Sequence, residues 1–94
     1  MFEWDSKKAE SNEDKHGVSF EEASTIFFDP GGLDGEDLAH SVQEERRYRL
    51  GQSVAGNLLV IFYTVRSQGH EKAIRLISAR LANRKEKTRY QAKD

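Results

Sequence analysis

The chain has 94 residues, no cysteine and a formal net charge of −1 at pH 7. That length suits one domain, over residues 1–94, with a single modest core, and the lack of cysteine excludes disulfides and thiolate metal sites. The longest apolar run, residues 58–63, is too short to span a bilayer, and the polar N-terminus does not resemble a signal peptide. We therefore expect no membrane association and a cytoplasmic location.

The small net charge hides an uneven distribution of charge along the chain. Residues 1–45 contain three Lys, no Arg and thirteen Asp or Glu, whereas residues 46–94 contain twelve Arg or Lys and three Asp or Glu. The two halves therefore carry formal charges of −10 and +9. Such a division indicates either a surface for a polyanion or a protein partner, or two halves that neutralise each other across the fold.

The N-terminal segment predicts a short strand and a polar helix. Residues 2–4 alternate apolar and polar side chains, as a strand does. Asp5 is placed as the N-cap of a helix over residues 6–15, and Gly17 ends that helix because glycine adopts the left-handed conformation without steric cost. The apolar face of this helix is thin.

A second helix and an acidic loop are predicted next. Ser19 and Glu22 form an S-x-x-E capping box, which starts the helix. The segment Asp29-Pro30-Gly31-Gly32 ends it, since proline and glycine cannot continue a helix. Residues 31–41 are acidic, rich in glycine and without periodicity, and predict a loop.

The second half predicts three strands and a final helix. Tight turns are indicated at residues 54–57 and 67–70, and an N-x-x-E capping arrangement of Asn83 and Glu86 opens the last helix. The expected elements are strands at 47–50, 58–65 and 72–79 and a helix at 83–92. The order is thus β-α-α-β-β-β-α, an α+β fold with an antiparallel sheet, helices mainly on one face, and the other face or its rim open.

Most sites with a recognisable sequence signature are missing. His16, His40 and His70 are far apart, each in or next to a turn, and none has metal-ligand spacing, so we predict isolated surface histidines and no metal. No P-loop, GxGxxG or GxSxG segment is present, so nucleotide-binding folds and serine hydrolases have no support, and we expect no cofactor.

The reactive side chains that are present suffice for RNA cleavage without a metal. A Glu or His can take the proton of a 2′-hydroxyl, Arg or Lys can neutralise the phosphorane, and His, Lys or Tyr can protonate the leaving 5′-oxygen. Each candidate also has a structural explanation. Arg80, which ends an apolar strand, can form a structural ion pair, Tyr90 can anchor the last helix in the core, and the basic residues of that helix can form a solvated face.

Four strings then match a known family over residues 2–90. FEWDSKK and KHGVSFEEA in the first quarter, HS..EER at 40–46 and IRLISAR.A.RKEK.RY near the end resemble the BrnT family of bacterial toxins. The resemblance implies a RelE-like ribonuclease of a type II toxin–antitoxin system, whose free form cleaves RNA and arrests translation. It also implies a BrnA-type antitoxin partner with a ribbon-helix-helix part, through which the complex binds its own promoter DNA.

The resemblance also implies site residues, carried over by their positions in these strings. His40 or Glu45 is expected as the base, Arg46 and Arg80 on the phosphate, and His16 or Tyr90 as the acid. Further contacts to RNA are expected from Lys15, Arg84, Lys85 and Arg89. Residues 56–59, the acidic loop 31–39 and the turn 67–73 depart from the family's pattern. Two other functions stay open: a non-catalytic module that binds nucleic acid or protein, and a degenerate toxin that retains only antitoxin binding.

Overall fold

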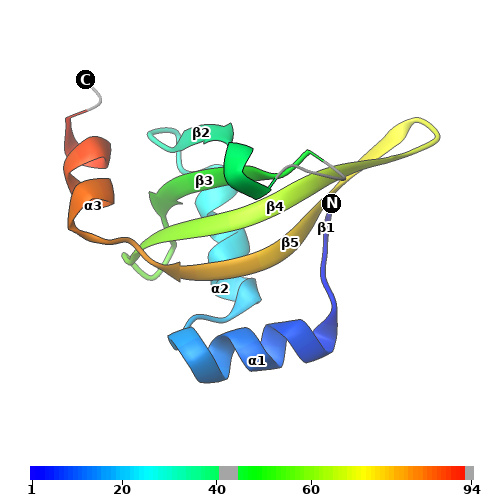
Figure 1. Ribbon diagram of the computed structural model, residues 1–94, viewed down its shortest axis with the longest axis horizontal. Coiled ribbons are helices and arrows are strands. Elements are labelled where there is room, and N and C mark those ends of the chain that lie inside the picture. The colour runs from blue at the N-terminus through cyan, green and yellow to red at the C-terminus, as the bar shows by residue number, and fades with distance from the viewer. Residues whose placement is uncertain (41–44, 93–94) are drawn as a thin grey trace.

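A five-stranded sheet forms the centre of the molecule (Figure 1). The computed structural model describes residues 1–40 and 45–92, and of His40 and Gln68 it describes the backbone alone. The elements in chain order are β1 (Phe2–Glu3), α1 (Ser6–His16), α2 (Phe20–Ser24), the 3-10 helix η1 (Thr25–Phe28), β2 (Leu33–Glu36), the 3-10 helix η2 (Leu38–His40), β3 (Arg47–Gln52), β4 (Leu58–Gln68), β5 (Glu71–Leu81) and α3 (Arg84–Gln91).

The strands lie in the order β1-β5-β4-β3-β2, with β1 parallel to β5 and every other pair antiparallel. The predicted helices and the β3–β4–β5 meander are all present, with ends that differ by a few residues. The predicted antiparallel sheet is confirmed for β2 to β5, whereas β1 pairs in parallel with β5 and makes the sheet mixed. None of the described helices is long and apolar enough to cross a membrane.

The predicted loop at 31–41 contains the edge strand β2, which the predicted element order lacks. The sequence of β2 has little strand propensity, but each of its four residues is paired across the strands with a residue of β3. Asp34 forms an ion pair with Arg47, and Gly35 leaves space for the ring of its partner Tyr48. Cross-strand partners therefore override local preference here.

One face of the sheet is covered by α1, α2 and η1, and it carries the main core. Phe20, Ala23 and Ile26 are fully buried against Ile61 and Ala79 of the central strands. Figure 1 shows α1 and α2 against this side of the sheet and α3 standing at the opposite end from the N-terminus. We call this face the covered face.

Helix α1 is polar, and a single buried side chain ties it to the sheet. Asn12 donates through Nδ2 to the carbonyl oxygens of Ala79 (2.9 Å) and Val18 (3.1 Å), and its Oδ1 accepts from the N–H of Ala79 (3.1 Å). Since β1 pairs only with residues 74 and 75 of β5, the amide of Asn12 satisfies the backbone of β5 beyond the end of β1. This contact compensates for the small apolar face of α1.

Candidate functional site

The face of the sheet opposite the helices α1 and α2 is only partly covered. Its core is small, with Leu50, Val60 and Ala82 buried and Tyr90 of α3 packed against them. Strand pairing places Tyr48, Phe62 and Ser78 in one row on this face and Leu50, Val60 and Arg80 in the next. We define the open face as the partly buried or exposed residues on this side: Tyr48, Phe62, Arg75, Ser78, Arg80 and, from α3, Arg89.

Arg80 lies at the end of β5 and is held by a carboxylate. Its Nη1 and Nη2 donate to the two oxygens of Glu86 at 2.8 and 2.9 Å, and its guanidinium carbon lies 5.7 Å from the centre of the Phe62 ring. The hydrogen bonds from Arg80 lower the pKa of Glu86, whose side chain is only 17% exposed. Glu86 also completes the capping box with Asn83 that the sequence predicts. Arg80 therefore fixes the first turn of α3 to the sheet.

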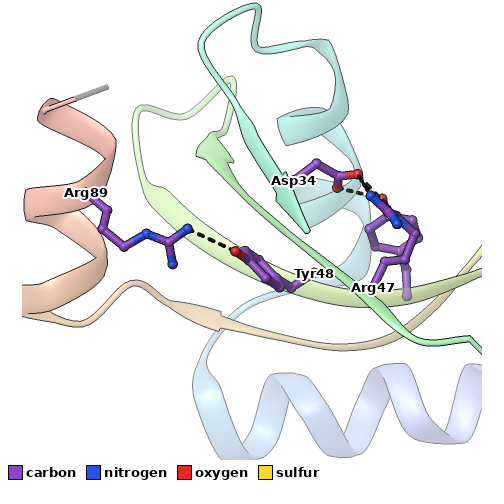
Figure 2. A network of polar contacts seen from close by, with 5 residues as sticks. Asp34, Arg47, Tyr48 and Arg89 are labelled. Atoms are coloured by element: carbon purple, nitrogen blue, oxygen red, sulfur yellow. Dashed lines mark hydrogen bonds and ion pairs between the residues drawn. The ribbon is translucent and has the colours of Figure 1, made fainter. Parts of the chain in front are cut away.

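Arg89 contacts the ring of Tyr48 at its hydroxyl end (Figure 2). Its Nη2 donates to the Tyr48 hydroxyl at 2.9 Å, and its guanidinium carbon lies 5.6 Å from the ring centroid. The ring itself rests on β2, since a Cβ on Gly35 would lie 2.7 Å from its Cε2 and Oη atoms. Arg89 is exposed and forms no ion pair with a described residue.

Tyr90 anchors the other side of α3. Its hydroxyl donates to Oδ2 of Asp29 at 2.5 Å, and this hydrogen bond raises the pKa of Tyr90. The same carboxylate accepts from the N–H groups of Gln52 (2.8 Å) and Gly31 (2.9 Å). The carboxylate of Asp29 thus joins the turn after η1 to the end of β3, and Tyr90 attaches α3 to it.

The second network in Figure 2 lies on the covered face and is structural. Arg47 donates through Nη2 (2.9 Å) and Nε (3.3 Å) to Asp34, and the Tyr63 hydroxyl donates to the same carboxylate at 2.6 Å. Burial is the first cause that raises the pKa of Tyr63 to about 12. Arg49 is also used for the fold, since it donates to the carbonyl oxygens of Ile26 and Asp29.

Lys15 and His16 lie beside the edge of the open face. They end α1 and line a hollow of about 210 Å³ together with Ile77 and Ser78 of β5. Ser78 is also the cross-strand partner of Phe62, so this hollow borders the open face. No hydrogen bond or ion pair among the described residues joins Lys15 or His16 to Arg80.

The remaining predicted site residues come from η2, the segment before β3 and the first turn of α3. Glu45 is exposed and Arg46 is partly buried, immediately before β3, where the Arg46 carbonyl accepts from the N–H of Asp37 at 2.7 Å. The side chain of His40 lies outside what the structure describes. Arg84 and Lys85 are exposed on the first turn of α3. In the described part of the chain, no group of three or more His, Asp or Glu side chains is arranged to hold a metal ion.

Sequence reasoning missed Tyr48 and Phe62, which lie at the centre of the open face. The alternation of Arg47, Tyr48, Arg49 and Leu50 predicts that Tyr48 and the two arginines point to opposite sides of the sheet. It does not tell which side the helices cover. Only the register with β4 and the position of α1 and α2 resolve that question.

Comparisons with known proteins agree with this arrangement. Residues 4–86 match the profile of the family described as "Ribonuclease toxin, BrnT, of type II toxin-antitoxin system". The 1.1 Å crystal structure of the Brucella abortus ribonuclease toxin BrnT matches with a TM-score of 0.62 and 21% identity, over 89% of this chain and 99% of that one, which indicates a shared fold. No curated protein sequence matches significantly. Because the family profile spans most of its length, the chain belongs to the BrnT family of type II toxin–antitoxin ribonuclease toxins.

Proposed function

We propose that this chain is an endoribonuclease toxin that cleaves RNA without a metal ion, on the open face and its rim. The observation that carries the proposal is the concentration of arginines on a sheet face that α1 and α2 leave uncovered. Arg80 and Arg89 lie on this face, and α3 adds the exposed cations Arg84, Lys85 and Lys87, none of which forms an ion pair with a described residue. Such a surface attracts a polyanion, whatever the net charge of the chain.

The proposed reaction uses the 2′-hydroxyl of RNA as the nucleophile. Glu45 or His40 takes the proton of this hydroxyl, the 2′-oxygen attacks the phosphorus, and the bond to the 5′-oxygen breaks. Arg46, next to Glu45, neutralises the charge that develops on the phosphoryl oxygens. Arg80 lies four residues further along the sheet and two strands away, where it binds an adjoining phosphate. An acid returns a proton to the leaving 5′-oxygen, so the products carry a 2′,3′-cyclic phosphate and a 5′-hydroxyl.

Of the two proposed acids, His16 is favoured by its surroundings. The proton of Tyr90 is already engaged with Asp29 at 2.5 Å, whereas His16 lines a hollow beside Ser78. Tyr90→Phe separates the two roles. If Tyr90 is only an anchor, the variant loses stability, about 1.5–3 kcal/mol for a hydrogen bond to a charged group, and keeps its kcat. If it is the acid, kcat falls by two or more orders of magnitude.

The function is tested by expression and by cleavage of purified RNA. Induction of the wild type is expected to stop growth, and the purified protein to cleave single-stranded RNA in the presence of EDTA. A substrate with 2′-deoxyribose at the scissile position should stay intact. A folded Glu45→Ala, Arg80→Ala double variant is expected to lose toxicity, whereas Lys7→Ala on the exposed side of α1 should keep it. A fully toxic double variant would refute these site assignments.

A non-catalytic binding module is the second candidate, and two contacts favour it. Arg80 is engaged with Glu86 and Tyr90 with Asp29, so both residues already have structural roles. Under this alternative the wild type binds RNA with a strong dependence on salt, but leaves it intact over hours without added metal. A degenerate toxin that retains only antitoxin binding would neither cleave nor bind RNA.

We further propose that a BrnA-type antitoxin with a ribbon-helix-helix part covers α3 and part of the open face, and that the complex binds promoter DNA through the antitoxin. Helix α3 has no buried residue, so it offers surface to a partner. A partner that binds only the native state at a thousandfold excess over its Kd stabilises it by about 4 kcal/mol. The melting temperature should therefore rise clearly on complex formation, and equal values with and without antitoxin would contradict this contact.

A further inference from the structure

Two aromatic side chains lie side by side among the arginines of the open face. Tyr48 of β3 and Phe62 of β4 are directly paired across the strands, so their rings are neighbours on one side of the sheet. Both stay partly exposed although they pack against the smaller core cluster. A surface that alternates flat rings with cations matches a ligand that alternates flat bases with phosphates.

The ring of Tyr48 lies flat on the sheet, and Gly35 makes this possible. A Cβ at position 35 would lie 2.7 Å from Cε2 and Oη of Tyr48 and 2.8 Å from its Cζ, closer than carbon atoms can pack. One side of the ring therefore rests on the backbone of β2. Tyr48 is partly exposed, so we infer that the side away from β2 is the one open to a ligand. The guanidinium of Arg89 lies at the hydroxyl end of the ring, 5.6 Å from its centroid (Figure 2).

We propose that Tyr48, with Phe62 beside it, stacks a nucleobase of single-stranded RNA, while Arg89 binds an adjoining phosphate. The class of ligand rests on the proposed function. A base gains more from stacking on an aromatic ring than an exposed guanidinium gains from a cation–π contact, so the base displaces Arg89 from the ring. The displaced guanidinium is then close to the phosphate of the same nucleotide.

The two arginines beside the rings differ in how firmly they are held. Arg89 is exposed and reaches Tyr48 through one hydrogen bond of 2.9 Å to a neutral hydroxyl. Arg80 is held by two hydrogen bonds to the carboxylate of Glu86. Tyr48 is therefore the ring that becomes available to a base, and Phe62 extends the platform beneath Arg80.

The test measures binding of a short single-stranded RNA whose riboses carry 2′-O-methyl groups, so that it is not cleaved through the 2′-hydroxyl. One base is removed at each position in turn. At one position, removal of the base is expected to raise the Kd of the wild type about 5- to 150-fold, the equivalent of about 1–3 kcal/mol of stacking. Tyr48→Leu should bind the intact RNA more weakly by a similar factor and should be insensitive to the missing base.

The conservative variant separates the ring from the hydroxyl. Tyr48→Phe keeps the ring and removes the hydrogen bond to Arg89, so it should retain most of the affinity and the sensitivity to the missing base. Phe28→Leu is the matched control, because Phe28 is an exposed aromatic residue that packs on Phe2 on the covered side. Its Kd values should equal those of the wild type.

Two results would overturn the stacking site. One is a Tyr48→Leu variant that remains as sensitive to the missing base as the wild type. The other is a Tyr48→Phe variant that loses as much affinity as Tyr48→Leu, since Tyr48 would then act only by positioning Arg89. If Tyr48→Leu does not fold, Tyr48→Trp is used instead, and its indole fluorescence should be quenched by the intact RNA and not by the RNA that lacks the base.

Cleavage of unmodified RNA separates this inference from the proposed function. If the wild type cleaves RNA and Tyr48 shows no coupling to any base, the stacking site is wrong and the nuclease proposal stands. If the coupling is found and no RNA is cleaved in EDTA, the stacking site stands and the proposed metal-independent nuclease is wrong.

Discussion

The two faces of the sheet use arginine differently. On the covered face, Arg47 donates to Asp34 and Tyr63, and Arg49 donates to two backbone carbonyl groups, so both guanidinium groups are fixed by the fold. On the open face, Arg89 contacts an aromatic ring and donates to one neutral hydroxyl. On the covered face arginine thus stabilises the fold. On the open face Arg80 is held by Glu86 and Arg75 by Glu3, whereas Arg89 remains available to a ligand.

This difference resolves the uneven charge of the sequence. Contacts such as Arg47–Asp34, Arg66–Glu3 and Arg75–Glu3 do join the basic second half to the acidic first half. Arg80 instead pairs with Glu86 from its own half. Neutralisation across the fold is therefore real but partial, and no ion pair among the described residues joins a cation of α3 to the acidic first half.

The largest difference between the faces is expected in their apolar side chains. Phe20 is fully buried and packs edge to face against Trp4 at 5.9 Å, so Phe20→Ala should cost about 3–5 kcal/mol. Phe62→Ala on the open face should cost less than half of that, because its ring is partly exposed. Urea unfolding of both variants checks the ratio, and equal losses would mean that the open face is as much a core as the covered one.

The next largest effect concerns the anchor of α1. Asn12→Ala removes two donors and one acceptor and leaves backbone groups of Ala79 and Val18 buried without partners, which should cost about 2–3 kcal/mol. Ser11→Ala, at an exposed position of the same helix, should change the free energy of unfolding by less than about 0.5 kcal/mol. If both variants lose the same free energy of unfolding, the hydrogen bonds of Asn12 do not contribute measurably to stability.

Local features of the fold could be predicted from the sequence, whereas long-range ones could not. The N-caps at Asp5, Ser19 and Asn83 are formed by residues close in sequence, and the structure confirms all three. The predicted capping box of Ser19 and Glu22 is only half formed, because the Glu22 carboxylate accepts from Ser53 and Asn57, about thirty positions away. Strand β2 was missed because its stability comes from β3, through the contacts of Asp34 and Gly35 with residues more than ten positions away. The strand propensity of residues 33–36 does not reveal such distant partners.

The candidate site, too, could be predicted from the sequence only in part. The charge of residues 80–89 is visible in the sequence, but the bond between Tyr90 and Asp29 spans 61 positions and the bond between Arg89 and Tyr48 spans 41. Both depend on where α3 comes to rest on the sheet. The sequence therefore indicated which cations to consider, and the position of α3 decides which of them face a ligand.

A smaller effect is expected from the ion pair that holds α3, and it depends on pH. Glu86→Gln should cost about 1 kcal/mol near neutral pH, since the pair is bidentate but partly exposed. The pKa of Glu86 is lowered in the folded protein by its bonds to Arg80. Its contribution is thus complete above the ordinary glutamate pKa of about 4.5 and is lost as the pH falls through the lower folded value.

The difference in the free energy of unfolding between the wild type and Glu86→Gln should therefore become smaller as the pH is lowered through that range. Thermal unfolding at a series of acid pH values measures the gap. Glu10→Gln, at an exposed position of α1 without an ion pair to a described residue, is the control and should show no gap at any of them. A gap for Glu86→Gln that stays constant down to acid pH would mean that the pair with Arg80 contributes no net stability.

The smallest effect on stability, and the most direct test of the difference between the faces, is expected for Arg89. Because its side chain is exposed and bound to a neutral hydroxyl, Arg89→Ala should change the free energy of unfolding by no more than about 1 kcal/mol. If Arg89 binds a phosphate, the same variant should reduce the slope of log K against log salt for single-stranded RNA by about 0.7. Lys7→Ala, at an exposed position of α1, should leave the slope unchanged. A slope that is equal in the wild type and Arg89→Ala would place this arginine among the structural ones, and the open face would then lose its most available cation.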